Sequence, residues 1–134
     1  MKNEQQRLAA ANEFIKSIAG CGRNFFSENS DLRNKVENPF VSTLEIDNRG
    51  RVWFIDYYTK KRIYTHYSGR WNGFTSGGTL RDIIISLRNY VKLGSKLRAN
   101  YFNPDWGHGF GNPWGYGDEI LKVKEAAIRL DIAV

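Results

Sequence analysis

The sequence predicts a single α+β domain in which a three-stranded antiparallel sheet is packed by helices. Two segments, residues 4–19 and 79–93, carry apolar residues at helical spacing, and three short strand-like stretches lie between them. Consecutive strands flanked by helices are typical of α+β domains, so the expected order is α-β-β-β-α-loop-α. At 134 residues the chain has the length of one ordinary domain, and we assign residues 1–134 to it.

The first helix is expected over residues 4–19. The residues that form its apolar stripe are Leu8, Ala11, Phe14, Ile15 and Ile18. Gly20 and Gly22 follow, and glycine readily takes the left-handed conformation that ends a helix.

Three strands are expected next, over residues 40–47, over residues 51–57, and from residue 61 or 62 to residue 67. The D-N-R-G sequence at 47–50 predicts a hairpin turn in which Gly50 takes a positive φ. The second strand is apolar on both faces, which is typical of a central strand or of one that offers rings to a ligand. The next turn, near Thr59, leaves the register of the second hairpin open, because one residue more or less would exchange the cross-strand partners.

The helix that follows the sheet has the clearest periodicity in the chain. Its apolar residues are Leu80, Ile83, Ile84, Leu87, Tyr90 and Val91. Thr79 is expected to cap its start, with Asp82 completing a capping box, and Gly94 is expected to end it.

Residues 99–117 are rich in glycine and aromatic residues, show no period, and are expected to form a loop. Asp118 is expected to cap a last helix. The residues that this helix would turn inward are Ile120, Val123, Ala127 and Leu130.

The positive charge of the chain is concentrated in its middle. Residues 49–98 hold eleven basic and two acidic residues, a net charge of +9, whereas the rest of the chain carries −3. A concentrated positive field attracts phosphate, so the charge favours a nucleic-acid partner, DNA or RNA, although many basic proteins bind none. We therefore predict a non-enzymatic nucleic-acid-binding domain that uses a basic face of residues 60–98.

Specific residues follow from this prediction. The candidates for binding phosphate or another anion are Lys60, Lys61, Arg62, Arg70, Gly77, Gly78, Arg81, Arg88, Lys92 and Lys96. Arg81, Arg88 and Lys92 share one stripe of their helix. The S-G-G-T sequence at 76–79 would place backbone amides at a helix start, where anions bind, or it is an ordinary turn into a helix.

Aromatic residues are interleaved with the basic residues of the strands. Trp53, Tyr57 and Tyr64 are candidates for stacking on the bases of a nucleic acid, as aromatic rings on sheets do in several single-strand binders. The alternative is that these residues simply favour strands and that half of them face the core.

No pattern in the chain indicates catalysis or a metal site. His66 and His108 are the only histidines, and no H-x-x-H or C-x-x-C sequence is present, so we expect no enzyme, no cofactor and no metal. The lone Cys21 cannot form an internal disulfide, and no apolar run approaches the roughly 18 residues that span a bilayer. We expect a cytoplasmic protein without a membrane partner.

Residues 59–80, TKKRIYTHYSGRWNGFTSGGTL, resemble uncharacterised small proteins of enterobacterial prophages and mobile elements. The resemblance brings no known activity with it. Together with the aromatic and glycine-rich segment 99–117 it motivates an alternative function, that of an accessory protein which binds and modulates a host protein of defence or replication. The residues that would then contact the partner are Trp106, Phe110, Trp114 and Tyr116. The same aromatic loop could instead cover the core, because so many rings are costly to leave in water.

Overall fold

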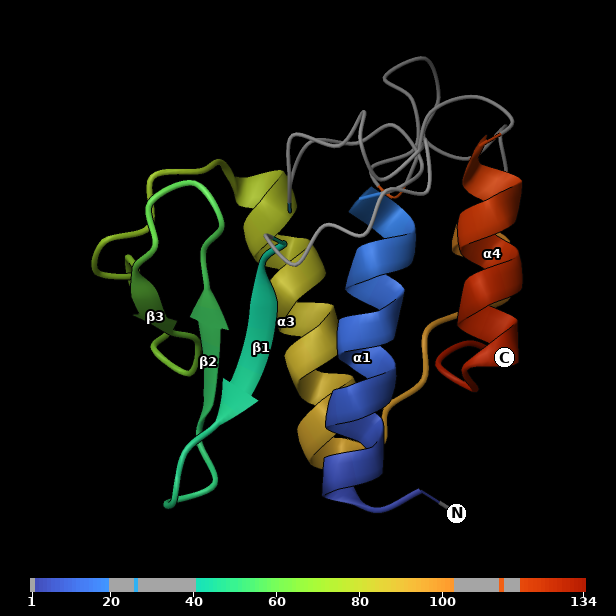
Figure 1. Ribbon diagram of the computed structural model, residues 1–134, viewed down its shortest axis with the longest axis horizontal. Coiled ribbons are helices and arrows are strands. Elements are labelled where there is room, and N and C mark those ends of the chain that lie inside the picture. Colours follow the sequence, from blue (N-terminus) through green and yellow to red (C-terminus); the bar gives the residue numbers. More distant parts are fainter. Residues whose placement is uncertain (1, 20–25, 27–40, 103–113, 115–118) are drawn as a thin grey trace.

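The computed structural model describes residues 2–19, 26, 41–102, 114 and 119–134 (Figure 1). Within them the elements are α1 (Glu4–Ala19), β1 (Thr43–Ile46), β2 (Val52–Ile55), β3 (Arg62–Tyr64), α3 (Gly78–Leu93), the 3-10 helix η1 (Ala99–Phe102) and α4 (Glu119–Arg129). Three strands follow the first helix and the other helices follow them, which confirms the predicted α+β fold. The expected loop over residues 99–117 begins instead with η1.

The three strands form one antiparallel sheet in the order β1-β2-β3. Trp53 of β2 lies opposite Glu45 of β1 and opposite Tyr64 of β3, and this fixes the register that the sequence left open. The first hairpin turns at residues 47–50, with Gly50 at a φ of 76° as predicted. Lys60 takes a φ of 61° in the second turn.

All three strands are shorter than expected. For β3, the reason is that the side chains of the two residues after Tyr64 take the place of backbone hydrogen bonds to β2. The hydroxyl of Thr65 donates to the carbonyl of Val52 at 2.7 Å, and Nε2 of His66 accepts from the amide of Val52 at 2.9 Å. Both backbone groups of Val52 are thereby paired without a further residue of strand.

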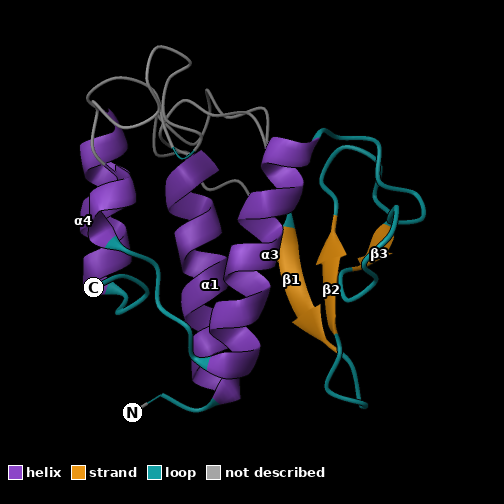
Figure 2. Ribbon diagram, turned by 180° about the vertical axis from the view of Figure 1, so that it is seen from behind, coloured by secondary structure: helices purple, strands orange, loops and turns teal. Residues whose placement is uncertain are grey.

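The helices lie on one side of the sheet (Figure 2). The inner face of the sheet presents four buried residues to them: Leu44, Val52, Phe54 and Ile63. From the sheet outward, α3 and α1 come first and α4 packs on the far side of α1. The C-terminal segment after α4 pairs with the segment after α3 through a parallel bridge between Ala133 and Leu97.

The outer edge of β1 is protected by a side chain of α1. The Asn12 amide donates to the carbonyl of Leu44 at 3.1 Å and accepts from its N–H at 2.8 Å, as a neighbouring strand would. This pairing leaves the backbone of Leu44 unable to recruit another strand.

The start of α3 differs from the prediction. The helix begins at Gly78, and its N-cap is Gly77, with no hydrogen bond from a capping side chain. Thr79 already lies inside the first turn, so its assignment as the cap, and the capping box with Asp82, are wrong. The predicted end is confirmed: Gly94 has a φ of 73° and donates to the carbonyl of Tyr90.

The apolar side of α4 is as predicted, since Ile120, Val123 and Ala127 are buried and Leu130 is partly buried. Gly20, Gly22 and Asp118, which were expected to end or begin helices, lie outside the described residues.

Candidate nucleic-acid interface

The outer face of the sheet carries rings and cations. Alternation along the strands turns Trp53, Arg62 and Tyr64 away from the core, because their neighbours Phe54 and Ile63 point inward and are buried. In the part of the chain that the structure describes, no helix or strand packs on this face (Figures 1 and 2). On this face Arg62 is exposed, and Trp53 and Tyr64 are partly exposed.

Trp53 and Tyr64 form a pair at the centre of this face. They are cross-strand partners, and their ring centroids lie 5.2 Å apart. The guanidinium carbon of Arg62 lies 4.0 Å from the centroid of the Trp53 ring, and that of Arg51 lies 5.7 Å from the ring of Tyr64. Such cation–π contacts hold both charges beside the rings, and Nε of Arg51 also donates to Asp47.

Asp47 anchors this cluster from the hairpin turn. One carboxylate oxygen accepts from the indole N–H of Trp53 and from Nε of Arg51, each at 2.8 Å, and the other accepts from the amides of Arg49 and Arg51. Burial raises the pKa of Asp47, but the hydrogen bonds from Trp53 and Arg51 outweigh it and hold that pKa well below its usual range. Asp47 thus stays charged and fixes the orientation of the Trp53 ring.

The second turn adds a further ring and a cation. Nζ of Lys60 lies 4.3 Å from the centroid of the Tyr57 ring, and Tyr57 and Tyr58 meet edge to face at 5.1 Å. The hydroxyl of Ser42 accepts from the amide of Tyr57 at 2.7 Å and ties this turn to the start of β1. Lys61 is exposed in the same turn.

Arg81 is held by the loop that leads into α3. Its Nη2 donates to the three carbonyls of residues 67–69, at 2.8 to 3.3 Å, and its guanidinium carbon lies 4.7 Å from the centroid of the Trp71 ring. The charge therefore fastens this loop to the first turn of α3.

The two other cations of the predicted α3 stripe also cross-link elements. Arg88 donates to the carbonyl of Thr65 just after β3, and its other nitrogens bond to the side chain of Asn89. Lys92 bonds to the carboxylate of Glu4 in α1 at 2.8 Å. Arg88 therefore ties α3 to the end of the sheet, and Lys92 ties α3 to α1.

His66 lies on the outer face next to Tyr64, with ring centroids 5.5 Å apart. Burial lowers the pKa of His66, and the positive charges of Arg88 and Lys92 lower it further. A neutral ring suits its bond, because Nε2 must be unprotonated to accept from Val52.

The S-G-G-T sequence borders an open groove of about 280 Å³. The residues that line it include Arg70, Phe74, Gly77, Gly78 and Arg81. A Cβ atom at Gly77 or Gly78 would meet no atom within 4 Å, and Gly77 has a φ of −82°. The fold therefore does not demand glycine at these positions, and anion binding here stays a prediction.

Two groups of predicted residues lie apart from the outer face. Lys96 follows α3 and pairs with Asp131 after α4, at 2.6 Å. Trp114 is only 6% exposed and packs against Phe14 and Phe102, with centroids 5.9 and 5.2 Å away. Trp106, Phe110 and Tyr116 lie outside the described residues.

Sequence reasoning counted Arg51 among the basic residues interleaved with the strand aromatics, but left it and Asp47 out of the candidate site residues. Asp47 was interpreted only as a polar residue at the end of the first strand and in the turn that follows. The signal that could have found it is its position in a tight hairpin turn, which brings the strand residues on either side together. Asp47 can therefore reach both Arg51 and Trp53.

Among the described residues, no three His, Cys, Asp or Glu side chains gather in a way that could hold a metal ion. Of the helices that the structure describes, none is long and apolar enough to cross a membrane.

Comparison with known proteins places the chain in a family. The model of the family described as YoqU matches residues 2–131, and the chain belongs to this family. Searches of curated proteins and of solved structures each found no match.

Proposed function

We propose that this YoqU-family chain binds nucleic acid and that the outer face of its sheet receives a single strand. The observation that carries the proposal is the Trp53–Tyr64 pair with the guanidinium groups of Arg51 and Arg62 beside it. Aromatic rings on an open sheet stack on unpaired bases, and each base contributes about 1–3 kcal/mol. Guanidinium groups at their rim supply charged donors for the phosphates.

The kind of nucleic acid follows from what the rings can reach. In a duplex the base faces are stacked on one another, so a ring fixed on a sheet cannot stack on them. The Trp53 ring is fixed, because Asp47 holds its indole N–H. We therefore expect single strands to bind more tightly than duplexes, with little preference for sequence, since every base has a face that stacks.

The basic residues around the sheet support the proposal through their field. Residues 49–98 carry +9, and exposed cations of the turn after β2 and of the loop before α3, such as Lys60, Lys61 and Arg70, add to the positive charge around the rings. Such a field raises the rate of encounter with a polyanion. It also requires that affinity fall as salt rises.

Titration of labelled single-stranded DNA, single-stranded RNA and duplex, followed by fluorescence anisotropy, tests the proposal. Tyr64→Ala is expected to weaken single-strand binding by about 5- to 150-fold, the equivalent of one lost stack. Tyr64→Phe is the matched control, because it keeps the ring and should bind as the parent does. The proposal fails if neither single strand binds at low salt, or if the alanine variant binds like the phenylalanine variant.

We further propose that the chain comes from a prophage or mobile element, as the resemblance of residues 59–80 suggests; the genes that neighbour its own would test this. The accessory role would be favoured instead if the chain binds no oligonucleotide but captures a protein from bacterial lysate that has been treated with nuclease.

A further inference from the structure

One acidic side chain lies among the rings and cations of the outer face. Glu45 of β1 is the cross-strand partner of Trp53, and it points outward because its neighbour Leu44 is buried. The Glu45 side chain is 56% exposed. A carboxylate repels phosphate, so a face that bound only the backbone of a nucleic acid would be better without it. Its place beside a stacking ring points instead to a contact with a base.

Arg62 brings its guanidinium group next to this carboxylate. Its guanidinium carbon lies 4.0 Å from the centroid of the Trp53 ring, and its Nε lies 3.9 Å from Oε2 of Glu45. The second distance is too long for a hydrogen bond. Among the residues that the structure describes, neither side chain hydrogen-bonds to any other residue. Within that part of the chain, the donors of Arg62 and the acceptors of Glu45 are therefore open to a ligand.

The two groups place hydrogen-bond donors beside acceptors. A carboxylate offers two oxygens that accept, and a guanidinium group only donates. Guanine has the matching order along its Watson–Crick edge, where O6 accepts and the adjoining N1–H and N2 amine donate. Adenine and cytosine have an acceptor at the centre of that edge, and thymine and uracil have a single donor between two acceptors. Guanine is thus the base that can give neighbouring donors to both oxygens of one carboxylate.

We propose that Glu45 selects guanine at one position of the bound single strand. Its carboxylate accepts from N1–H and from the N2 amine, while Arg62 donates to O6. The proposal rests on the proposed function, because the strand must first stack on the outer face. A guanidinium group has several N–H donors, so Arg62 can meet O6 and still contact a phosphate. The rings accept any base, so the preference is confined to the base that meets Glu45.

Strands that differ in one base test the selection. The probes are labelled oligothymidines of about eight nucleotides with a single central guanine, hypoxanthine or adenine, titrated at low salt and followed by fluorescence anisotropy. The parent is expected to bind the guanine strand about tenfold more tightly than the adenine strand, which has a purine of the same size without the two donors. Hypoxanthine keeps O6 and N1–H but lacks the N2 amine, so its strand should fall between the two.

Glu45→Gln is the variant that tests the role of the carboxylate. The amide has the same size but keeps one acceptor and turns donors toward the base, so the preference for guanine should disappear. The strand of thymine alone should bind somewhat more tightly, because a negative charge leaves the face. Since Glu45 is exposed, the melting temperature should not fall.

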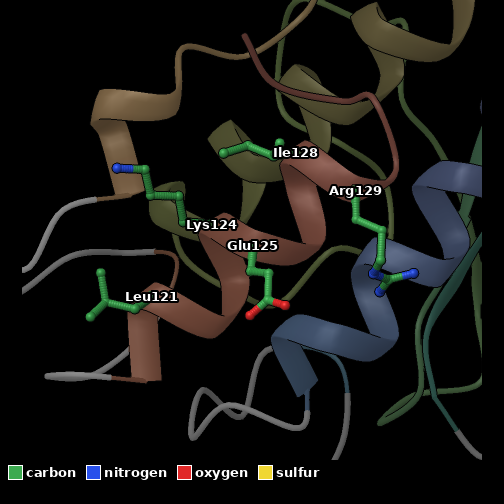
Figure 3. Close-up of a pocket in the computed structure, with 5 residues that line it drawn as sticks. All are labelled: Leu121, Lys124, Glu125, Ile128 and Arg129. Carbon is green, nitrogen blue, oxygen red and sulfur yellow. The ribbon is translucent and has the colours of Figure 1, made fainter.

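Glu125→Gln is the matched control for a lost carboxylate. Glu125 is exposed on α4, in an open groove of about 380 Å³ that Leu121 and Ile128 also line (Figure 3). This helix packs on the far side of α1 from the sheet, so the variant should keep the parent's preference for guanine.

The outcomes separate this proposal from the proposed function. Equal binding of the guanine and adenine strands by the parent would overturn the selection and leave single-strand binding in place. Tighter binding of every strand by Glu45→Gln, with the preference unchanged, would show that Glu45 only repels phosphate. If the parent binds no single strand at low salt, the proposed function itself fails, and the selection fails with it. Guanosine monophosphate that binds as tightly as the guanine strand would overturn the assignment to a strand.

Discussion

Two sets of basic residues, one on α3 and one on the outer face of the sheet, differ in what their charges contact. On α3, Arg88 and Lys92 bond to a backbone carbonyl after β3 and to a carboxylate of α1. On the sheet, Arg62 and Lys60 lie 4.0 and 4.3 Å from the centroids of aromatic rings. The first set cross-links elements of the fold, whereas the second keeps guanidinium and ammonium groups beside rings that bases could stack on.

The difference shows why a count of charges does not locate a binding site. Both sets contribute equally to the net charge and to the long-range field. A cation that donates to a backbone carbonyl stabilises the fold, and its removal leaves that carbonyl unpaired. Moving a cation from an aromatic ring to a phosphate gives up a cation–π contact, which is worth about 0.5–1 kcal/mol at an exposed site. We therefore expect substitutions in the α3 set to change stability, and substitutions in the sheet set to change binding.

The largest expected effect is on the stability of an α3 variant. Arg88→Ala should lower the free energy of unfolding by about 2 kcal/mol, because it leaves the carbonyl of buried Thr65 without this donor. Urea denaturation measures the loss, and Arg88→Lys, which retains one donor group, should recover part of it. A variant as stable as the parent would show that the two sets do not differ.

A smaller effect is expected for the sheet set, and it should appear in binding. Arg62→Ala should weaken single-strand binding several-fold and reduce the salt slope by about 0.7, as one lost phosphate contact requires. Its free energy of unfolding should change by less than about 0.5 kcal/mol, because its ion pair with Glu45 is long and exposed. Arg129→Ala on α4 is the control for a lost charge away from the sheet. An unchanged salt slope for Arg62→Ala would contradict the proposal that the outer face of the sheet binds the phosphates.

A pH effect on stability is expected at His66, which lies beside Tyr64 of the outer face and within the field of Arg88 and Lys92 of α3. Its pKa in the folded chain lies below the ordinary 6.5, owing to burial and to Arg88 and Lys92, while Asp47 opposes them. The unfolded chain therefore binds more protons, so stability should rise with pH between the folded value and about 6.5 and then level off. His66→Gln keeps an acceptor for the amide of Val52 and should flatten the melting temperature across this range. A profile identical to that of the parent would exclude His66 as the cause.

The smallest effect is expected at the start of α3. Thr79→Ala should change the free energy of unfolding by less than about 0.5 kcal/mol, because Thr79 caps nothing and alanine is the better helix former. Thermal unfolding measures it. A loss of about 1 kcal/mol, which is typical of a removed cap, would contradict the observed start of the helix.

Local sequence was sufficient for much of the fold. The bounds of α1, the turn at residues 47–50 and the end of α3 at Gly94 depend on neighbours a few residues away, and all three are as predicted. The start of α3 was misplaced by the same kind of reasoning, because Thr79 satisfies the capping pattern while Gly77 takes the position. A residue with the right side chain does not cap unless the backbone begins its first turn there.

The candidate site depended less on local pattern. Trp53 and Tyr64 could be named from the sequence, but only the register of the second hairpin makes them partners. Trp114 stood in an aromatic loop that could have been a surface, and its packing against Phe14 and Phe102 makes it part of the core.

By itself the sequence determined the order of the elements, the inward side of each helix and the excess of positive charge in the middle of the chain. Only the tertiary structure decided which of those charges are engaged. Arg88 meets the carbonyl of Thr65 across 23 positions, and Lys92 meets Glu4 across 88. Helical and strand periods report on neighbours a few residues apart, so contacts between such distant positions leave no trace in them.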